Sequence, residues 1–412
     1  MGMKILLISP VPTHPQYAGN RIRILQLAEH LRAEGCELYF AYYDHEGAGG
    51  NFKEMRRFWE NKAVFLSERN QNIVFKARKF FNHGLFSRQA NDAQKERRTL
   101  SAEKKLLDLD VWNNRQFDDS LLKFHSRVGF HMVWVEYVFL SGVLDRFDSN
   151  VIKVIDTHDV FTDRHKLFAE NQVEPEWFYT SKEMEKKGLC RADYVIAIKD
   201  RDAQFFMSLG LPRVITIGHF FPAQTNRMNH HKDADLLFLA SDNISNVMAW
   251  RYFTEDILER IVQRIPRVSI QVAGRICQRI PDSPFYQKIG TISDLTAIYS
   301  SVKVAINPVT FGTGLKIKSI EPLAYGCPVV TTPPGIEGIE DAENQGVLVG
   351  KTSDDFAGHL VSLLTEPSRY NEQSEMGHRY FCRYQAQNKQ RLNSLLTEVR
   401  KRLQISLEDK NP

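Results

Sequence analysis

The order of glycines, lysines and apolar residues predicts the local structure of the stretch Phe311-Gly-Thr-Gly-Leu-Lys-Ile-Lys-Ser-Ile-Glu-Pro-Leu-Ala-Tyr-Gly-Cys-Pro-Val-Val-Thr331. Glycines open the stretch, and the pattern predicts a helix that begins near Gly314 or Leu315. Gly326 follows the last helical position, where glycine commonly ends a helix. The apolar residues after it predict a short buried strand.

Two lysines, Lys316 and Lys318, fall in the first turns of this expected helix. The free N–H groups of a helix start already carry partial positive charge, so lysines there are electrostatically misplaced. A bound anion would relieve the repulsion, and the glycines would let a phosphate approach the backbone closely. We therefore predict a diphosphate site at this turn, with Glu321 one turn further on to bind a sugar hydroxyl.

Short apolar runs alternate with longer helical patterns along the whole chain, which is typical of α/β proteins. The length of 412 residues indicates two domains. A stretch rich in His, Asn and Pro over 220–233 predicts the boundary between them. We expect an N-terminal Rossmann-like domain over 1–222, a C-terminal one over 223–385, and a helix over 386–412 that packs back on the first domain.

The strands and helices below are predicted from the spacing of apolar residues. The expected strands are 4–9, 37–43, 132–136, 151–156, 194–198, 235–240, 269–273, 302–307, 328–332 and 346–349, and the expected helices are 20–33, 246–265, 294–300, 353–364 and 371–405. In such domains, ligand sites lie at the carboxyl ends of the strands.

Composition excludes several classes of protein. Apolar content of 42% and charged content of 25% are those of a globular protein, and a net charge of +4 gives no global case for nucleic-acid binding. No apolar run approaches the length of a membrane span. The five cysteines are odd in number, widely spaced and without a C-x-x-C pair. This pattern favours free thiols in a reducing cytoplasm over a disulfide framework or a zinc site.

The segment 51–98 differs from its surroundings, because it holds twelve Lys or Arg against five Asp or Glu and interleaves them with aromatic residues. One interpretation is a surface that meets anionic lipid or a lipid-linked acceptor at the inner face of a membrane. The other is an amphipathic helix pair that packs on the sheet and leaves its basic side chains in solvent.

Two positions in the first half are candidates for substrate contact. Gly19 opens the first helix after a long loop, where it could let a substrate approach the helix end or could only shape the turn. His158 and Asp159 follow a strand that ends at Asp156. A histidine between carboxylates can be oriented and partly charged, so it could contact a transferred sugar, or it could be fixed by hydrogen bonds in a packed loop. A metal site is disfavoured because these residues lack a convincing partner set.

Three positions in the second half have two interpretations each. Asn246 begins a helix and could cap it or line the diphosphate site. Gly274 and Arg275 follow a buried strand, and Arg275 could pair with phosphate or lie on the surface. Familiar catalytic motifs are missing: the chain has no G-x-S-x-G elbow, no Walker loop and no G-x-G-x-x-G after its first strand.

Taken in order, these motifs resemble those of the family-four glycosyltransferases of the GT-B fold, which has two facing Rossmann-like doubly wound domains with a cleft between them. The resemblance runs from Lys4 to about Val349. It is carried by Ser9-Pro10 with Gly19, Asp156-Thr-His-Asp159, Arg191-Ala-Asp-Tyr-Val-Ile-Ala-Ile198, Leu237-Phe-Leu with Asn246-Val247, Pro266 with Ile270 and Gly274-Arg275, Gly290 with Asp294-Leu295, and Gly312 to Val330.

This resemblance implies a retaining, metal-independent transfer of a sugar from a nucleotide-diphosphate-sugar to a glycan or lipid-linked acceptor, as in surface polysaccharide or lipopolysaccharide synthesis. It implies that the reaction needs no metal and no other cofactor, and we expect no nucleic-acid partner. Glu321 matches the glutamate that binds the donor ribose, and either Lys316 or Lys318 would hold the diphosphate, with Lys316 preferred because it is nearer the free amides of the helix start. The expected donor-binding set is Gly19, Asn246, Gly274, Arg275, Gly312, Thr313, Gly314, Leu315, Lys316, Lys318 and Glu321, and the expected catalytic set is His158, Asp159 and Lys316.

One position departs from the family pattern. Many relatives have a second glutamate eight residues before the ribose glutamate, and this chain has Thr313 there. The departure indicates either a sub-group that uses Gly-Thr-Gly-x-Lys or a catalytically degenerate binding or scaffold protein. A nucleotide-sugar epimerase or a sugar phosphorylase on the same fold is a further alternative. The chain shows no proton-abstracting pair for an epimerase, and a phosphorylase would usually need a pyridoxal-binding lysine and a larger chain. Lys318 lies three residues before Glu321. Instead of binding a diphosphate, it could therefore form an ordinary surface ion pair with Glu321.

Overall fold

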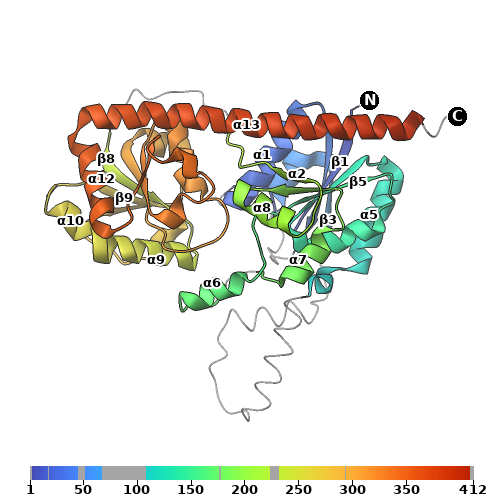
Figure 1. Cartoon of the computed structure of the whole chain (residues 1–412), viewed down its shortest axis with the longest axis horizontal. Coiled ribbons are helices and arrows are strands. Elements are labelled where there is room, and N and C mark those ends of the chain that lie inside the picture. The colour runs from blue at the N-terminus through green and yellow to red at the C-terminus, as the bar shows by residue number, and fades with distance from the viewer. Residues whose placement is uncertain are drawn as a thin grey trace, which may run out of the picture. The chain divides into compact units, whose positions relative to one another are not determined.

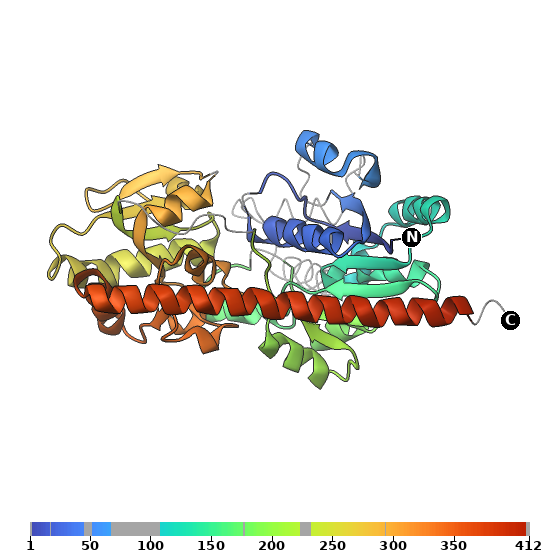
Figure 2. The same cartoon turned by 90° about the horizontal axis from the view of Figure 1, so that it is seen from above.

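The computed structural model of the chain describes residues 2–16, 18–44, 52–66, 108–175, 178–222, 232–292 and 294–408. These residues form two parallel sheets, one of seven strands and one of six, with helices around each (Figures 1 and 2). Contacts divide the chain into two compact units. Unit 1 comprises Met1–His165, Trp177–Ile217 and Arg391–Pro412, and unit 2 comprises Lys166–Glu176 and Gly218–Gln390.

The sheet of unit 1 has the strand order β3-β2-β1-β4-β5-β6-β7, and every neighbouring pair is parallel. Its strands are β1 (Lys4–Ser9), β2 (Glu37–Tyr43), β3 (Ala63–Leu66), β4 (Met132–Glu136), β5 (Ile152–Asp156), β6 (Tyr194–Ala197) and β7 (Val214–Thr216). The associated helices are α1 (Gly19–Ala33), α2 (Lys53–Trp59), α5 (Arg115–Val128), α7 (Lys182–Leu189) and α8 (Asp200–Ser208). The central strands are buried on both faces, as parallel strands covered by helices require.

The sheet of unit 2 has the strand order β10-β9-β8-β11-β12-β13 and is also parallel throughout. Its strands are β8 (Ala234–Leu239), β9 (Ile270–Ala273), β10 (Gln287–Gly290), β11 (Val302–Asn307), β12 (Val329–Thr331) and β13 (Val347–Val349). The helices are α9 (Ile244–Tyr252), α10 (Leu258–Val262), α11 (Leu295–Ser300) and α12 (Ser353–Thr365). Trp250, Phe253 and Phe238 stack in the core between the sheet and the α9–α10 segment.

The last helix, α13 (Pro367–Glu408), is continuous over 42 residues and is drawn in red in Figures 1 and 2. Its residues up to Gln390 belong to unit 2, and the remainder belongs to unit 1. Within unit 1, Glu398 accepts a hydrogen bond from Tyr194 at 2.8 Å and Arg402 pairs with Asp193 at 2.7 Å. Another helix, α6 (Arg164–Glu170), follows β5 in the chain, and the stretch from Lys166 to Glu176 is grouped with unit 2.

The predicted helix from Gly314 or Leu315 to Gly326 is wrong in type and in its start. The structure has two short 3-10 helices, Ile317–Ser319 and Glu321–Tyr325. Pro322 explains the difference, because a proline in an α-helix interior removes a backbone donor and clashes with the carbonyl four residues earlier. Gly326 ends the segment in the left-handed conformation, as expected, with φ of 63°.

The predicted helix over 246–265 begins earlier and is interrupted by a π turn at Phe253–Ile257. Most of the segment 51–98 lies outside the described residues, so neither interpretation of it is tested. Within the described part of the chain, no helix is long and apolar enough to span a bilayer.

Candidate functional site

The candidate donor site in unit 2 lies at the topological switch point of the sheet, where successive strands are added on opposite sides of the β8–β11 pair. Strands β8 and β11 are hydrogen-bonded neighbours at the middle of the sheet, and the chain runs outward from them in both directions. The loops after such a pair diverge at their carboxyl ends and leave room for a ligand. The residues of the opening sequence motif lie in the loop after β11, and Asn246 lies after β8.

The loop after β11 is closed around the side chain of Lys316. Its Nζ donates hydrogen bonds to the carbonyl oxygens of Thr313 and Gly314, both at 2.9 Å. Gly312 and Gly314 have φ of 142° and 74°, which residues with a Cβ rarely adopt. The hydroxyl of Ser245, in the first turn of α9, donates to the carbonyl of Phe311 at 2.7 Å, so the start of α9 holds the β11 loop in place.

Lys318 reaches the neighbouring loop. Its ammonium group bonds to Oδ1 of Asn246, and it also lies 5.4 Å from the ring centroid of Phe238. The cap of α9 is Asn243, not Asn246, since the side chain of Asn243 accepts the backbone N–H of Asn246 at 2.9 Å. Asn246 is therefore free of the capping role and presents its amide oxygen to Lys318.

The charge on Lys318 is energetically costly. Enclosure of its ammonium group, with repulsion from Lys316, lowers the pKa of Lys318 from 10.5 to about 7. Within the described residues its hydrogen-bonding partner is the amide oxygen of Asn246 and no carboxylate pairs with it. The expected ion pair of Lys318 with Glu321 does not form.

Glu321 instead faces Tyr299, whose hydroxyl donates to Oε2 of Glu321 at 2.9 Å. Burial raises the pKa of Glu321 to about 7, and the hydrogen bond from Tyr299 opposes this shift. A buried carboxyl group with one oxygen engaged can accept a further hydroxyl group on the other oxygen.

Gly274 and Arg275 have structural explanations in this structure. A Cβ at Gly274 would lie 2.2 Å from the carbonyl oxygen of Ala240, and Gly274 has φ of 94°, so only glycine fits. Arg275 pairs with Asp242 of the β8 loop at 2.8 Å. This ion pair brings Arg275 to the loop that carries Asn246, although its guanidinium is already engaged by a carboxylate.

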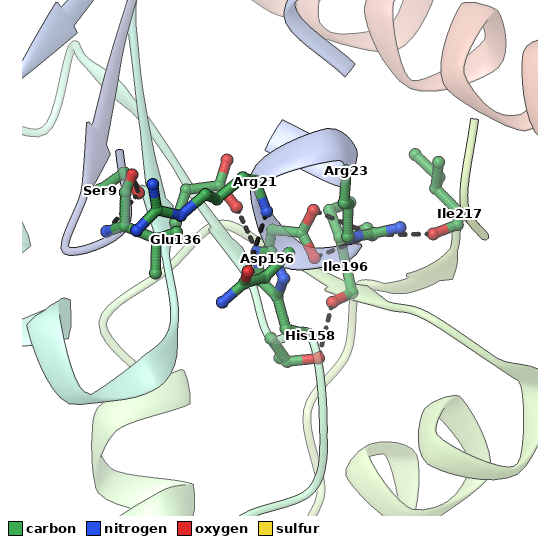
Figure 3. Close-up of polar contacts among 11 residues, drawn as sticks. Ser9, Arg21, Arg23, Glu136, Asp156, His158, Ile196 and Ile217 are labelled. Atoms are coloured by element: carbon green, nitrogen blue, oxygen red, sulfur yellow. Dashed lines mark hydrogen bonds and ion pairs between the residues drawn. The ribbon is translucent and has the colours of Figure 1, made fainter. Parts of the chain in front are cut away.

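The candidate site in unit 1 lies at the corresponding switch point, between β1 and β4. Glu136 ends β4 and is paired in register with Asp156, which ends β5. Gly19 begins α1 after the long loop that follows β1. Figure 3 shows the polar contacts of this region.

His158 is held by two neighbours. Its Nε2 lies 2.5 Å from Oε2 of Glu136, and its ring stacks on Tyr137 with centroids 4.0 Å apart. His158 has φ of 59°, which is uncommon for a residue with a side chain. Burial and the nearby Arg23 guanidinium hold the pKa of His158 well below its usual range.

Asp156 is bound by Arg23 of α1. One guanidinium nitrogen of Arg23 lies 2.9 Å from both carboxylate oxygens and 3.0 Å from the carbonyl of Ile217, as Figure 3 shows. Ligand atoms of Glu136, Asp156 and His158 all lie within 4.8 Å of one another, which would suit a cation. The Arg23 guanidinium already supplies positive charge to Asp156, so this arrangement does not favour a metal ion.

The Asp159 side chain contacts Val160 and Arg164. Its Oδ1 accepts the backbone N–H of Val160 at 2.9 Å, and its Oδ2 lies 3.7 Å from Arg164. The structure thus joins His158 to Glu136 and Asp156, and it gives Asp159 a role in shaping the following loop.

Three residues of these sites were missed at the level of sequence, namely Arg23, Glu136 and Tyr299. Two of them had a signal. Arg23 lies four residues before Leu27 on the apolar face of its helix, where a charge demands a buried partner. Glu136 ends an apolar strand in the same way as Asp156. Tyr299 had no such signal, because an aromatic residue on a short helix is ordinarily part of the core.

Residues 233–366 match the family model described as "Glycosyl transferases group 1". No curated protein matches the chain. The matched region runs from β8 to α12 and contains the candidate donor site.

Several solved structures share the fold. Sucrose-phosphate synthase from Thermosynechococcus elongatus is similar with a TM-score of 0.66 at 15% identity, over 96% of this chain and 99% of that one. A TarM variant from S. aureus, crystallised with Fondaparinux, alpha-GlcNAc-glycerol and UDP, gives 0.65 at 10% identity over 96% and 99%. The pneumococcal O-GlcNAc transferase GtfA, with UDP and GlcNAc, gives 0.63 at 10% identity over 97% and 99%. The predicted fold class, GT-B with two Rossmann-like domains, is confirmed.

Proposed function

We propose that the protein is a glycosyltransferase that moves a sugar from a nucleotide-diphosphate-sugar to a glycan or lipid-linked acceptor with retention of anomeric configuration. The observation that carries the proposal is the ammonium group of Lys318, which is enclosed at the carboxyl ends of β8 and β11 without a carboxylate partner among the described residues. A diphosphate is the kind of anion that such a group binds. The family match of residues 233–366 and the UDP named in similar structures support the same ligand class.

The roles within the site follow from the contacts. Lys318 holds the diphosphate, and Lys316 shapes the loop through its bonds to Thr313 and Gly314, which lets the Gly312–Gly314 backbone face the phosphates. Glu321 accepts a ribose hydroxyl while Tyr299 fixes its other oxygen.

The chemistry needs a group that stabilises the leaving diphosphate. Negative charge builds on the diphosphate as the bond to the sugar breaks, and a preorganised lysine and backbone N–H groups stabilise that charge. The acceptor hydroxyl then attacks the anomeric carbon from the face that the nucleotide leaves, and it gives its proton to an oxygen of the departing diphosphate. His158 positions the sugar, and no step of the proposal uses a metal ion.

The setting that fits this reaction is surface polysaccharide synthesis in the cytoplasm at the inner face of the membrane. The basic and aromatic composition of residues 51–98 supports contact with a lipid-linked acceptor.

A screen of UDP-, GDP-, ADP- and CMP-linked sugars by thermal shift would test the proposal, followed by an assay for release of the nucleotide from each stabilising donor. We expect one donor class to stabilise the protein and to be turned over. A second candidate, a catalytically degenerate binding protein, is favoured by Thr313 in place of the family glutamate. Binding without turnover in the presence of candidate acceptors would support that candidate and contradict a transferase. Near-normal turnover in Lys316→Ala, Lys318→Ala and Glu321→Ala would show that the site assignment is wrong.

A further inference from the structure

We propose that Glu136 is a positioning residue that stays uncharged, donates its carboxyl proton to Nε2 of His158, and thereby makes Nδ1 of His158 a hydrogen-bond donor toward a substrate oxygen. The substrate part of this inference rests on the proposed function. The part that concerns Glu136 and the His158 tautomer rests on the geometry of unit 1 alone.

The surroundings of Glu136 favour the neutral acid. Its side chain is fully buried at the end of β4, and its Oε2 lies 2.5 Å from Nε2 of His158. Its other oxygen, Oε1, is buried and has no hydrogen-bond donor among the described residues. An ionised carboxylate would leave a charged oxygen unsolvated there, which is far more costly than leaving the carbonyl oxygen of a neutral acid without a partner.

Among the described residues, no cation forms an ion pair with the Glu136 carboxyl group other than through the His158 contact. The guanidinium of Arg23 acts electrostatically on Glu136, but it donates hydrogen bonds to both carboxylate oxygens of Asp156 at 2.9 Å. Arg21, also on α1, donates to the backbone carbonyls of His14 and Pro15 at 3.5 and 3.4 Å.

The loop beyond His158 adds no free charge either. Asp159 is 3.7 Å from Arg164, and the ring that stacks on His158 belongs to the uncharged Tyr137. Since Arg23 and Asp156 neutralise each other, a neutral Glu136–His158 pair adds no buried charge, whereas a carboxylate–imidazolium pair would bury two further ions at a high desolvation cost.

The tautomer of His158 follows from this assignment. A neutral imidazole carries one hydrogen, so a ring that accepts at Nε2 must carry its hydrogen on Nδ1. Stacking on Tyr137, with an angle of 16° between the rings, keeps the ring from turning, and the His158 side chain retains 6% of its surface accessible. His158 therefore offers a donor of fixed direction, which suits a hydroxyl, phosphate or carbonyl oxygen of a substrate.

The titration behaviour agrees with the geometry. Burial and the Asp156 carboxylate raise the pKa of Glu136 well above its usual range. Burial and the Arg23 guanidinium lower the pKa of His158. Both shifts favour the uncharged forms of the two groups.

Nitrogen NMR of the imidazole side chains in the full-length, ligand-free protein would test the inference directly. A His158→Asn variant would assign the signals of His158 among the 13 histidines. We expect the Nδ1–H tautomer at pH 7, unchanged between pH 6 and 8. Glu136→Gln should preserve it, because an amide N–H can also donate to Nε2. Glu136→Leu should shift the population toward Nε2–H, because leucine offers no donor to Nε2.

An Nε2–H tautomer or an imidazolium in the wild-type protein at pH 7 would overturn the inference, as would an unchanged tautomer in Glu136→Leu with the fold intact by circular dichroism. The substrate arm is read separately, with a donor that the wild-type protein turns over. Glu136→Leu should then lower turnover at least tenfold, while Glu136→Gln stays within a few-fold of the wild type. A confirmed tautomer in a protein that turns over no donor would count against the proposed function and leave the Glu136 assignment in place.

Discussion

Replacing Lys318 by methionine tests whether its buried ammonium group is there to bind a diphosphate. Enclosure of the ammonium group and repulsion from Lys316 lower the pKa of Lys318 from 10.5 to about 7. A shift of that size means that its charged form is disfavoured by about 5 kcal/mol relative to a solvated lysine. An anion that restores the charge recovers part of this cost. A hydrogen bond to a charged group contributes about 1.5–3 kcal/mol, so Lys318→Met should weaken nucleoside diphosphate binding by about tenfold to a hundredfold.

The dependence on pH distinguishes this role from simple packing. A bound diphosphate favours the ammonium form, so above pH 7 binding must be accompanied by proton uptake at Lys318. The affinity of the wild-type protein should therefore fall as pH rises from 7 to 9, by up to about tenfold per unit. The pH range begins at 7 because the second phosphate ionisation lies near 6. Glu321 titrates in the same range but is present in both proteins, so the difference between their slopes reports Lys318.

Isothermal titration calorimetry in two buffers of different ionisation enthalpy would measure both the affinity and the protons taken up. Lys303→Met is a matched control, because Lys303 lies on β11 near its amino end and pairs with Asp235 at 2.8 Å, and its replacement should leave the affinity unchanged. Equal affinity and equal proton uptake in Lys318→Met and the wild type would refute the reasoning.

Two further substitutions test the ribose contact and the packing of the second unit. Glu321→Ala should weaken nucleoside diphosphate binding by about tenfold and leave pyrophosphate binding nearly unchanged, since the carboxyl group is assigned to ribose; equal losses for both ligands by calorimetry would contradict that role. Gly274→Ala should lower the free energy of unfolding by more than about 1 kcal/mol, because its Cβ would meet the Ala240 carbonyl at 2.2 Å at a positive φ. The control Gly358→Ala, in α12 with open space around the new Cβ, should raise it by about 0.5–1 kcal/mol, and urea denaturation that ranks the two variants otherwise would oppose this account.

The sequence was most informative where apolar periodicity was strong. The strands at 4–9, 37–43, 132–136 and 302–307 have the same bounds in the structure as in the prediction. Short edge strands such as β3 and β7 were not predicted, because three or four residues give too little pattern to separate them from loops. The predicted helix after Gly314 does not form, because Pro322 interrupts the α-helical hydrogen bonds that the glycine and lysine pattern around it indicates.

The site could be predicted in outline and not in its pairings. Lys318 and Glu321 were expected to matter, but spacing along one segment does not show that Lys318 meets Asn246 or that Glu321 meets Tyr299. These partners are 72 and 22 residues away in sequence, and they are brought together by the register of the sheet and its loops. Glu136 and His158 are likewise neighbours only because β4 and β5 pair in parallel.

The most direct test of the central claim is a crystal structure of the full chain with the nucleoside diphosphate that stabilises it most. The account predicts that the diphosphate lies within hydrogen-bond distance of Lys318 Nζ and of the backbone between Gly312 and Gly314, with a ribose hydroxyl on Glu321. A nucleotide that is bound elsewhere, with Lys318 still on Asn246 and Glu321 without a ribose contact, would contradict it.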